Sequence, residues 1–177
     1  DWVMPEDEEE KIELVQQQLF SGFDSSISSG KLEKKLDNKK IEYAESRDSK
    51  KDLRLYIIKG SLIDTRNAFS YKQIESNVDF FDGNFLSSKI FIDALNSTNL
   101  DEIASILYTF LVDFYSEPSS ESTIYSYQTF EWKKGEIETF LSIDKESNTI
   151  ILSEVNSALE ESRRFKEFKD KYIDQDQ

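Results

Sequence analysis

The feature that most constrains this chain is a long segment, residues 99–116, that is apolar on nearly every side of a predicted helix. Asn99 is placed to cap its start, with Glu102 at the reciprocal position of a capping box. One face carries Leu100, Ile103, Leu107, Phe110, Leu111 and Phe114, and Ile106, Tyr108, Val112 and Tyr115 fill much of the rest. A helix of this kind must be buried, so other elements have to surround it.

Strand patterns supply the partners for this helix. Residues 122–153 are rich in Tyr, Thr, Ile and Phe, and turn signals at 133–135 and 144–148 divide them into a three-strand antiparallel meander. Another alternating strand is predicted near 53–59. Residues 61–83 show no clean period, although Asp82-Gly83-Asn84 is a turn signal, and 85–95 suggest a short helix. A last helix is expected over 154–172, capped by Ser153.

The sequence therefore predicts an α+β fold, in which helices cover a small antiparallel sheet. The sheet would consist of the meander near 122–153 and the strand near 53–59. Residues 51–177 would form this core domain. Residues 1–50 are predicted to be a helical arm, with an acidic first helix, a Ser/Gly linker at 21–30 and a basic helix after it.

The absence of two residue types excludes several kinds of chemistry. The chain has no Cys and no His among its 177 residues. Disulfides, thiol nucleophiles, Ser-His-Asp triads and imidazole-ligated metals are therefore impossible. The five glycines are too scattered for a phosphate-binding loop. We expect no enzymatic activity, no catalytic residue, no metal and no cofactor.

Acidic side chains dominate the charge. The net charge is -14, although residues 31–60 hold ten basic and only six acidic side chains. Such a field repels nucleic acid phosphates, so no direct nucleic acid binding is expected, and it suits a basic protein partner. Carboxylate pairs are too common here to identify an acid-base enzyme. Residues 79–84 do not fit a calcium loop, because Val78 would be its first ligand.

Two apolar stripes are predicted to contact a partner protein. Ile12, Val15, Leu19 and Phe23 form a narrow stripe on the first arm helix, which resembles a groove-docking element. Tyr125, Tyr127 and Trp132 are expected on an aromatic sheet face, because Tyr and Trp are enriched at interface hot spots. The alternative for each stripe is that it packs against the protein's own core.

These features together favour a non-enzymatic adaptor, an intracellular subunit of a multiprotein complex in the cytoplasm or nucleus. The partner would bind to the arm helix and the aromatic face. The first alternative is an acidic inhibitor, of the immunity or nucleic-acid-mimic type, that blocks a basic enzyme. A further alternative is an exported bacterial surface protein, and an oxygen-ligand metal or carboxylate enzyme is the weakest. No apolar run is long enough for a membrane-spanning helix. The oligomeric state stays open.

Overall fold

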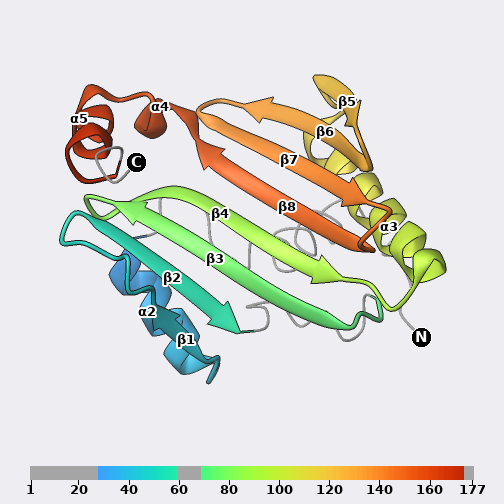
Figure 1. Ribbon diagram of the computed structural model, residues 1–177, viewed down its shortest axis with the longest axis horizontal. Helices are drawn as coiled ribbons and strands as arrows, with labels where there is room; N and C mark the ends of the chain where they lie inside the picture. The colour runs from blue at the N-terminus through green and yellow to red at the C-terminus, as the bar shows by residue number, and fades with distance from the viewer. Residues whose placement is uncertain (1–27, 60–68, 174–177) are drawn as a thin grey trace.

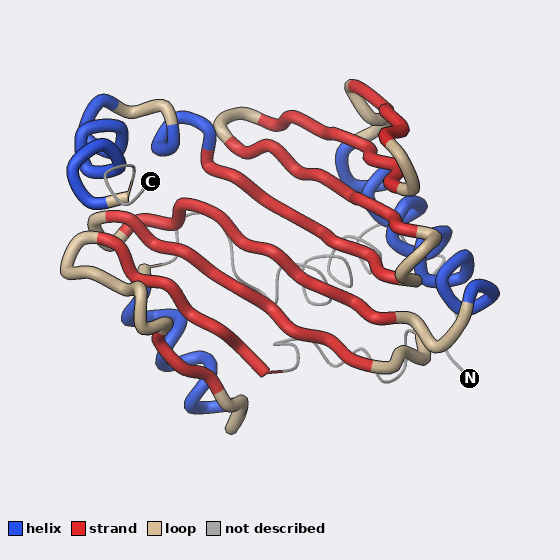
Figure 2. Tube along the Cα trace, in the orientation of Figure 1, coloured by secondary structure: helices blue, strands red, loops and turns tan. Residues whose placement is uncertain are grey.

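The computed structural model describes residues 28–59 and 69–173, and one eight-stranded antiparallel sheet dominates them (Figure 1). The strand order is β1-β2-β3-β4-β8-β7-β6-β5. The strands are β1 (Tyr43–Glu45), β2 (Leu53–Lys59), β3 (Gln73–Phe81), β4 (Asn84–Asp93), β5 (Ser120–Ile124), β6 (Tyr127–Lys134), β7 (Ile137–Asp144) and β8 (Thr149–Asn156). Figure 2 shows that the strands form one continuous layer.

The sheet consists of two four-stranded meanders that meet along β4 and β8. These two strands pair antiparallel from Ser87↔Val155 to Asp93↔Thr149. A tight turn joins β3 to β4, where Asp82 and Gly83 have φ values of 52° and 79°. Both values suit an Asp-Gly hairpin turn, which needs positive φ at its two central positions. The turn signal in the sequence is thus confirmed, and long strands flank it.

Two of the four described helices, α2 (Ser29–Asn38) and α3 (Ser97–Tyr115), cover one face of the sheet. The other two are α4 (Ser157–Glu160) and α5 (Arg163–Tyr172). α2 and α3 bury their apolar residues in the same cluster as the sheet, and both lie behind it in Figure 1. The Asn96 side chain caps α3 by accepting a hydrogen bond from the Asn99 backbone N–H at 2.9 Å.

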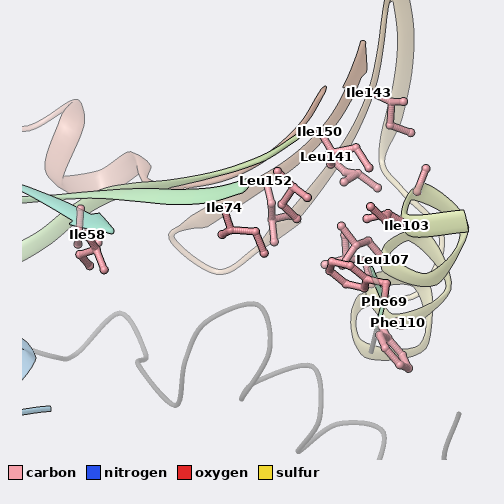
Figure 3. Close-up of a cluster of buried hydrophobic side chains, with 14 of the residues drawn as sticks. Ile58, Phe69, Ile74, Ile103, Leu107, Phe110, Leu141, Ile143, Ile150 and Leu152 are labelled. Atoms are coloured by element: carbon pink, nitrogen blue, oxygen red, sulfur yellow. The ribbon is translucent and has the colours of Figure 1, made fainter. Parts of the chain in front are cut away.

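The core between the sheet and α3 is built from alternating strand residues and one helix face. In Figure 3, Ile74, Leu141, Ile150 and Leu152 extend from the sheet toward α3, from which Ile103, Leu107 and Phe110 project. Aromatic rings extend this core across the sheet: Phe80 packs edge-on against Tyr56, with ring centroids 5.9 Å apart. Burial of each large apolar side chain stabilises the fold by roughly 1.5–3 kcal/mol.

The predicted fold class is wrong, because the sheet is far larger than a three-strand meander with one extra strand. The difference lies mainly in residues 73–93, which form β3 and β4 instead of an irregular segment and a short helix. In β3, small or polar residues take part in the alternation, so that Ser76 is buried between Ile74 and Val78. The two-residue alternation of this strand therefore cannot be recognised from the positions of its large apolar residues alone.

Two element boundaries also differ from the predictions. The cap of α3 is Asn96 instead of Asn99, and Asn99 instead donates from Nδ2 to the Ser70 carbonyl at 2.9 Å. β8 continues to Asn156, so the last helical region begins later than residue 154 and is divided into α4 and α5. The basic helix assigned to the arm is α2, and its residues Leu32 and Leu36 are fully buried in the core.

Candidate functional site: the open face of the sheet

The two faces of the sheet differ in what covers them. α2 and α3 cover the packed face. Among the described elements, only the C-terminal helices reach the other face, which we call the open face and which is turned toward the viewer in Figure 1. There Phe165 and Phe168 of α5 lie 5.1 and 5.2 Å from Phe81, measured between ring centroids. The middle of the open face and its far end are uncovered by any described helix.

Strand register arranges the open-face side chains in transverse rows, because directly paired residues of antiparallel strands point to the same side. The end row contains Tyr127, Asp144, Thr149, Asp93 and Gln73. The second row contains Thr129, Ser142, Ile151, Phe91 and Glu75. The third row contains Glu131, Phe140, Ser153, Lys89 and Asn77. The rows bring residues from five strands onto one surface.

Two adjoining depressions lie on this surface. The first has a volume of about 320 Å³ and is lined by Gln73, Glu75, Asn77, Phe91, Asp93 and Thr149. The second has a volume of about 250 Å³ and is lined by Ser46, Leu55, Tyr56, Ile57, Asn77, Asp79, Ser87 and Lys89. Asn77 belongs to both, and its Oδ1 atom is buried without a hydrogen-bond partner in the structure.

The two depressions differ in charge. Glu75 and Asp93 line the first, and no basic residue among the described residues does. In the second, Asp79 lies beside Lys89. Burial raises the pKa of Asp79, and the hydrogen bond from Ser87 and the charge of Lys89 oppose that rise. A positively charged group would therefore be attracted mainly to the first depression.

Exposed apolar side chains gather at the turn between β5 and β6, which we call the tip (Ile124–Tyr127). Tyr125 is 97% exposed, Ile124 63% and Tyr127 43%. Tyr125 also has a φ of 55°, a left-handed conformation that is rare for a bulky residue. Tyr127 stands in the end row of the open face, so the tip and the first depression share one end of the sheet.

The structure separates the residues that were predicted to contact a partner. Tyr125 and Tyr127 lie at the tip. Trp132 is only 2% exposed, and its Nε1 donates a hydrogen bond to the Ser116 carbonyl at 2.9 Å, so this side chain is part of the core and cannot reach a partner in this fold. The arm residues Ile12, Val15, Leu19 and Phe23 lie outside the described residues.

Sequence reasoning missed the residues of the first depression. Glu75, Phe91, Asp93 and Thr149 come from three strands, and none forms a recognisable motif with its chain neighbours. The available signal was the alternation of polar with buried residues in 73–81. Even with those strands assigned, the register between β4 and β8 is needed to place Thr149 beside Asp93.

A buried carboxyl group lies on the packed face, near the C-terminal end of α3. Glu154 is 7% exposed and pairs in register with Thr139 and Ser88. Burial raises its pKa to about 8. Tyr115, whose hydroxyl lies 3.4 Å from the Thr139 hydroxyl, has its pKa raised to about 12 by burial and by the nearby Glu154.

Residues 28–59 and 69–173 contain no group of three or more Asp, Glu, His or Cys side chains placed to hold a metal ion. In the same ranges, no helix has the length and apolar character needed to cross a membrane. Comparisons of the chain with protein-family models, with curated proteins and with solved structures found no match. The geometry of the open face and the tip is therefore the basis for a functional proposal.

Proposed function

We propose that the protein is a non-enzymatic interaction subunit that binds a partner protein through the tip. One observation carries this proposal: Tyr125 is 97% exposed in a left-handed conformation, between the exposed side chains of Ile124 and Tyr127. Tyrosine is enriched among the residues that contribute most to protein–protein binding. A bulky residue at positive φ costs stability, and such strain is found preferentially at functional sites.

The surroundings of the tip support a protein partner. β5 is the last strand of the sheet and all five of its residues are exposed. Its outer edge offers backbone groups with which an extended segment of a partner can pair. The net charge of -14 favours a basic partner and disfavours nucleic acid. The absence of Cys fits a reducing compartment, so we place this role in the cytoplasm or nucleus.

Tyr125→Gly tests the proposal, because it separates binding from stability. Glycine adopts positive φ without strain, so the variant should melt at the same temperature as the wild type or slightly higher. In affinity capture from the native extract, a protein retained by the wild type should be lost. Tyr172→Ser is the matched control, since Tyr172 is 41% exposed but belongs to α5. Equal retention by all three chains would refute the role of the tip.

A second candidate is an acidic inhibitor that blocks the cleft of a basic enzyme. The observation in its favour is the first depression, where the described lining residues include two carboxylates and no basic side chain. Binding by charge weakens steeply as salt rises, whereas binding through apolar side chains changes little. Capture at about 0.1 M and about 0.5 M salt, where the screening length falls by roughly half, therefore distinguishes the two functions. If the wild type and both variants retain the same partner at low salt and lose it at high salt, the inhibitor function is favoured.

A further inference from the structure

We propose that the first depression of the open face is a binding site for the guanidinium group of an arginine side chain on the partner protein. The inference rests on the proposed function in one respect: the arginine is taken to belong to a partner protein. The tip and the depression are made of different residues, so each can be tested without the other.

The depression is large enough to admit an arginine side chain. Its volume of about 320 Å³ lies at the lower end of the range for small-molecule sites. Paired strands β3, β4 and β8 form its base, so its lining side chains stand on a hydrogen-bonded sheet. A site on a rigid sheet holds its groups in place before the ligand arrives, which lowers the entropic cost of binding.

Two carboxylates provide the charge. Glu75 on β3 is paired with Phe91 on β4, and Asp93 follows two residues later on the same face of β4. Glu75 and Asp93 are thus diagonal neighbours, with Phe91 beside both. The Thr149 hydroxyl lies 3.2 Å from Asp93 Oδ1, where it can donate a hydrogen bond that orients the carboxylate. Carboxylates held this way form strong charge-assisted hydrogen bonds with a guanidinium group.

An aromatic ring beside the carboxylates makes the site suited to arginine. Phe91 lines the depression and is partly exposed, so a flat guanidinium group can stack on it. Arginine has five N–H donors and is less strongly hydrated than lysine, so it can donate hydrogen bonds to both carboxylates that line the depression.

Other ligands fit less well. A metal ion would need more than the two carboxylates present, and a phosphate would be repelled by them. Lys59 stands opposite Glu75 on β2, but it does not line the depression. In the second depression Lys89 already lies beside Asp79, so a second cation is not favoured there.

The experiment is a titration of the full-length ¹⁵N-labelled protein with a short acetylated and amidated Gly-Arg-Gly peptide, followed by amide chemical shifts. The matched peptide carries citrulline, which keeps the shape of arginine and lacks its charge. The arginine peptide should shift the amides of Glu75, Asn77, Phe91, Asp93 and Thr149 at about 10 mM, enough to occupy a site with a Kd of about 1 mM. The citrulline peptide should shift them far less.

Variants assign the effect to the depression. Glu75→Gln combined with Asp93→Asn should weaken arginine binding at least about tenfold, since both charges are removed while the new amide oxygen at position 93 can still accept from Thr149. Glu138→Gln is the matched control: Glu138 is also on the open face, but its carboxylate lies 3.7 Å from Lys133 Nζ, and its loss should leave the affinity unchanged.

Three outcomes would overturn the inference: no arginine-dependent shifts at these residues, equal shifts with citrulline, or equal weakening by Glu138→Gln, which would indicate unspecific attraction to an acidic surface. Tyr125→Gly should bind the peptide as the wild type does. If peptide binding fails while Tyr125→Gly still abolishes partner capture, only the arginine site is refuted. If peptide binding succeeds and capture does not depend on Tyr125, only the role of the tip is refuted.

Discussion

At the scale of single residues, Glu154 is the group whose environment most affects stability. Its carboxyl is buried and has its pKa raised to about 8, so the folded protein binds a proton there that the unfolded chain releases near pH 4.5. Stability from this residue is therefore fully present below about pH 4.5, falls as the pH rises toward 8, and is constant above it. Each pH unit in this window costs roughly 1.4 kcal/mol at most.

Glu154→Gln should remove this fall in stability with rising pH, because the glutamine amide is neutral at every pH and has nearly the same shape as the carboxyl group. We expect the variant to melt near the wild-type temperature at about pH 4.5, and several degrees higher at about pH 8. Thermal unfolding followed by circular dichroism at both pH values measures the difference. Glu138→Gln, on the exposed side of the same strand pair, should show no such dependence. Parallel melting curves of wild type and Glu154→Gln across this range would show that Glu154 is ionised in the fold.

The two faces of β6 explain why only part of the aromatic site was predictable. Tyr127 and Trp132 are five residues apart in one strand. Side chains alternate between faces along a strand, so an odd separation places these two on opposite sides. The sequence alone therefore contained the information that they cannot form one surface. It did not show which side is buried, since that depends on where α3 packs.

At the scale of elements, the open question is whether α2, which belongs to the predicted arm, contributes to the stability of the core. Leu36 is fully buried in the main apolar cluster. Leu36→Ala should lower the free energy of unfolding by about 2–5 kcal/mol, through lost burial and the cavity it leaves. Urea unfolding measures this change. Lys34→Ala is the control, because Lys34 is exposed on the same helix and alanine favours helix formation.

A change below about 0.5 kcal/mol in Leu36→Ala, comparable to that of a surface substitution, would mean that α2 is held only loosely. In that case residues 28–50 would behave as the arm that the sequence predicts. A large loss would instead move the start of the core from residue 51 to α2. The sequence gives little guidance here, because Leu32, Leu36 and Tyr43 are the main apolar residues among many charges.

Strand register limits how far the site could be predicted. The apolar helix 99–116 and the strands within 122–153 were recognisable from local patterns and correspond to α3, β6, β7 and β8, but the separate strand β5 and the turn before Tyr127 were not predicted. The first depression, in contrast, combines Glu75 with Thr149 across two strand pairings. The Asp82-Gly83 turn indicates the pairing of β3 with β4. No local pattern contains the pairing of β4 with β8, because it joins two meanders that are far apart in the sequence.

At the scale of the whole molecule, the seam between β4 and β8 predicts a single unfolding transition. The main core cluster includes Tyr56 and Ile58 from one meander and Leu141 and Leu152 from the other. Unfolding of either meander alone would therefore expose part of this shared core. We therefore expect the described core to unfold as one cooperative unit, as small single domains usually do.

Two spectroscopic signals can test this unity. In a Trp2→Phe variant, Trp132 is the only tryptophan left, and its buried ring reports on the second meander. Far-ultraviolet circular dichroism reports on all eight strands. In urea the two signals should give the same midpoint and the same slope. A fluorescence midpoint at a clearly different urea concentration would mean that the two meanders unfold separately. In that case β4 and β8 would separate before the rest of the fold unfolds, and the residues of the open face would no longer lie together. The end row and the first depression both cross that seam, so a shared transition is also the condition under which the arginine site is as stable as the protein itself.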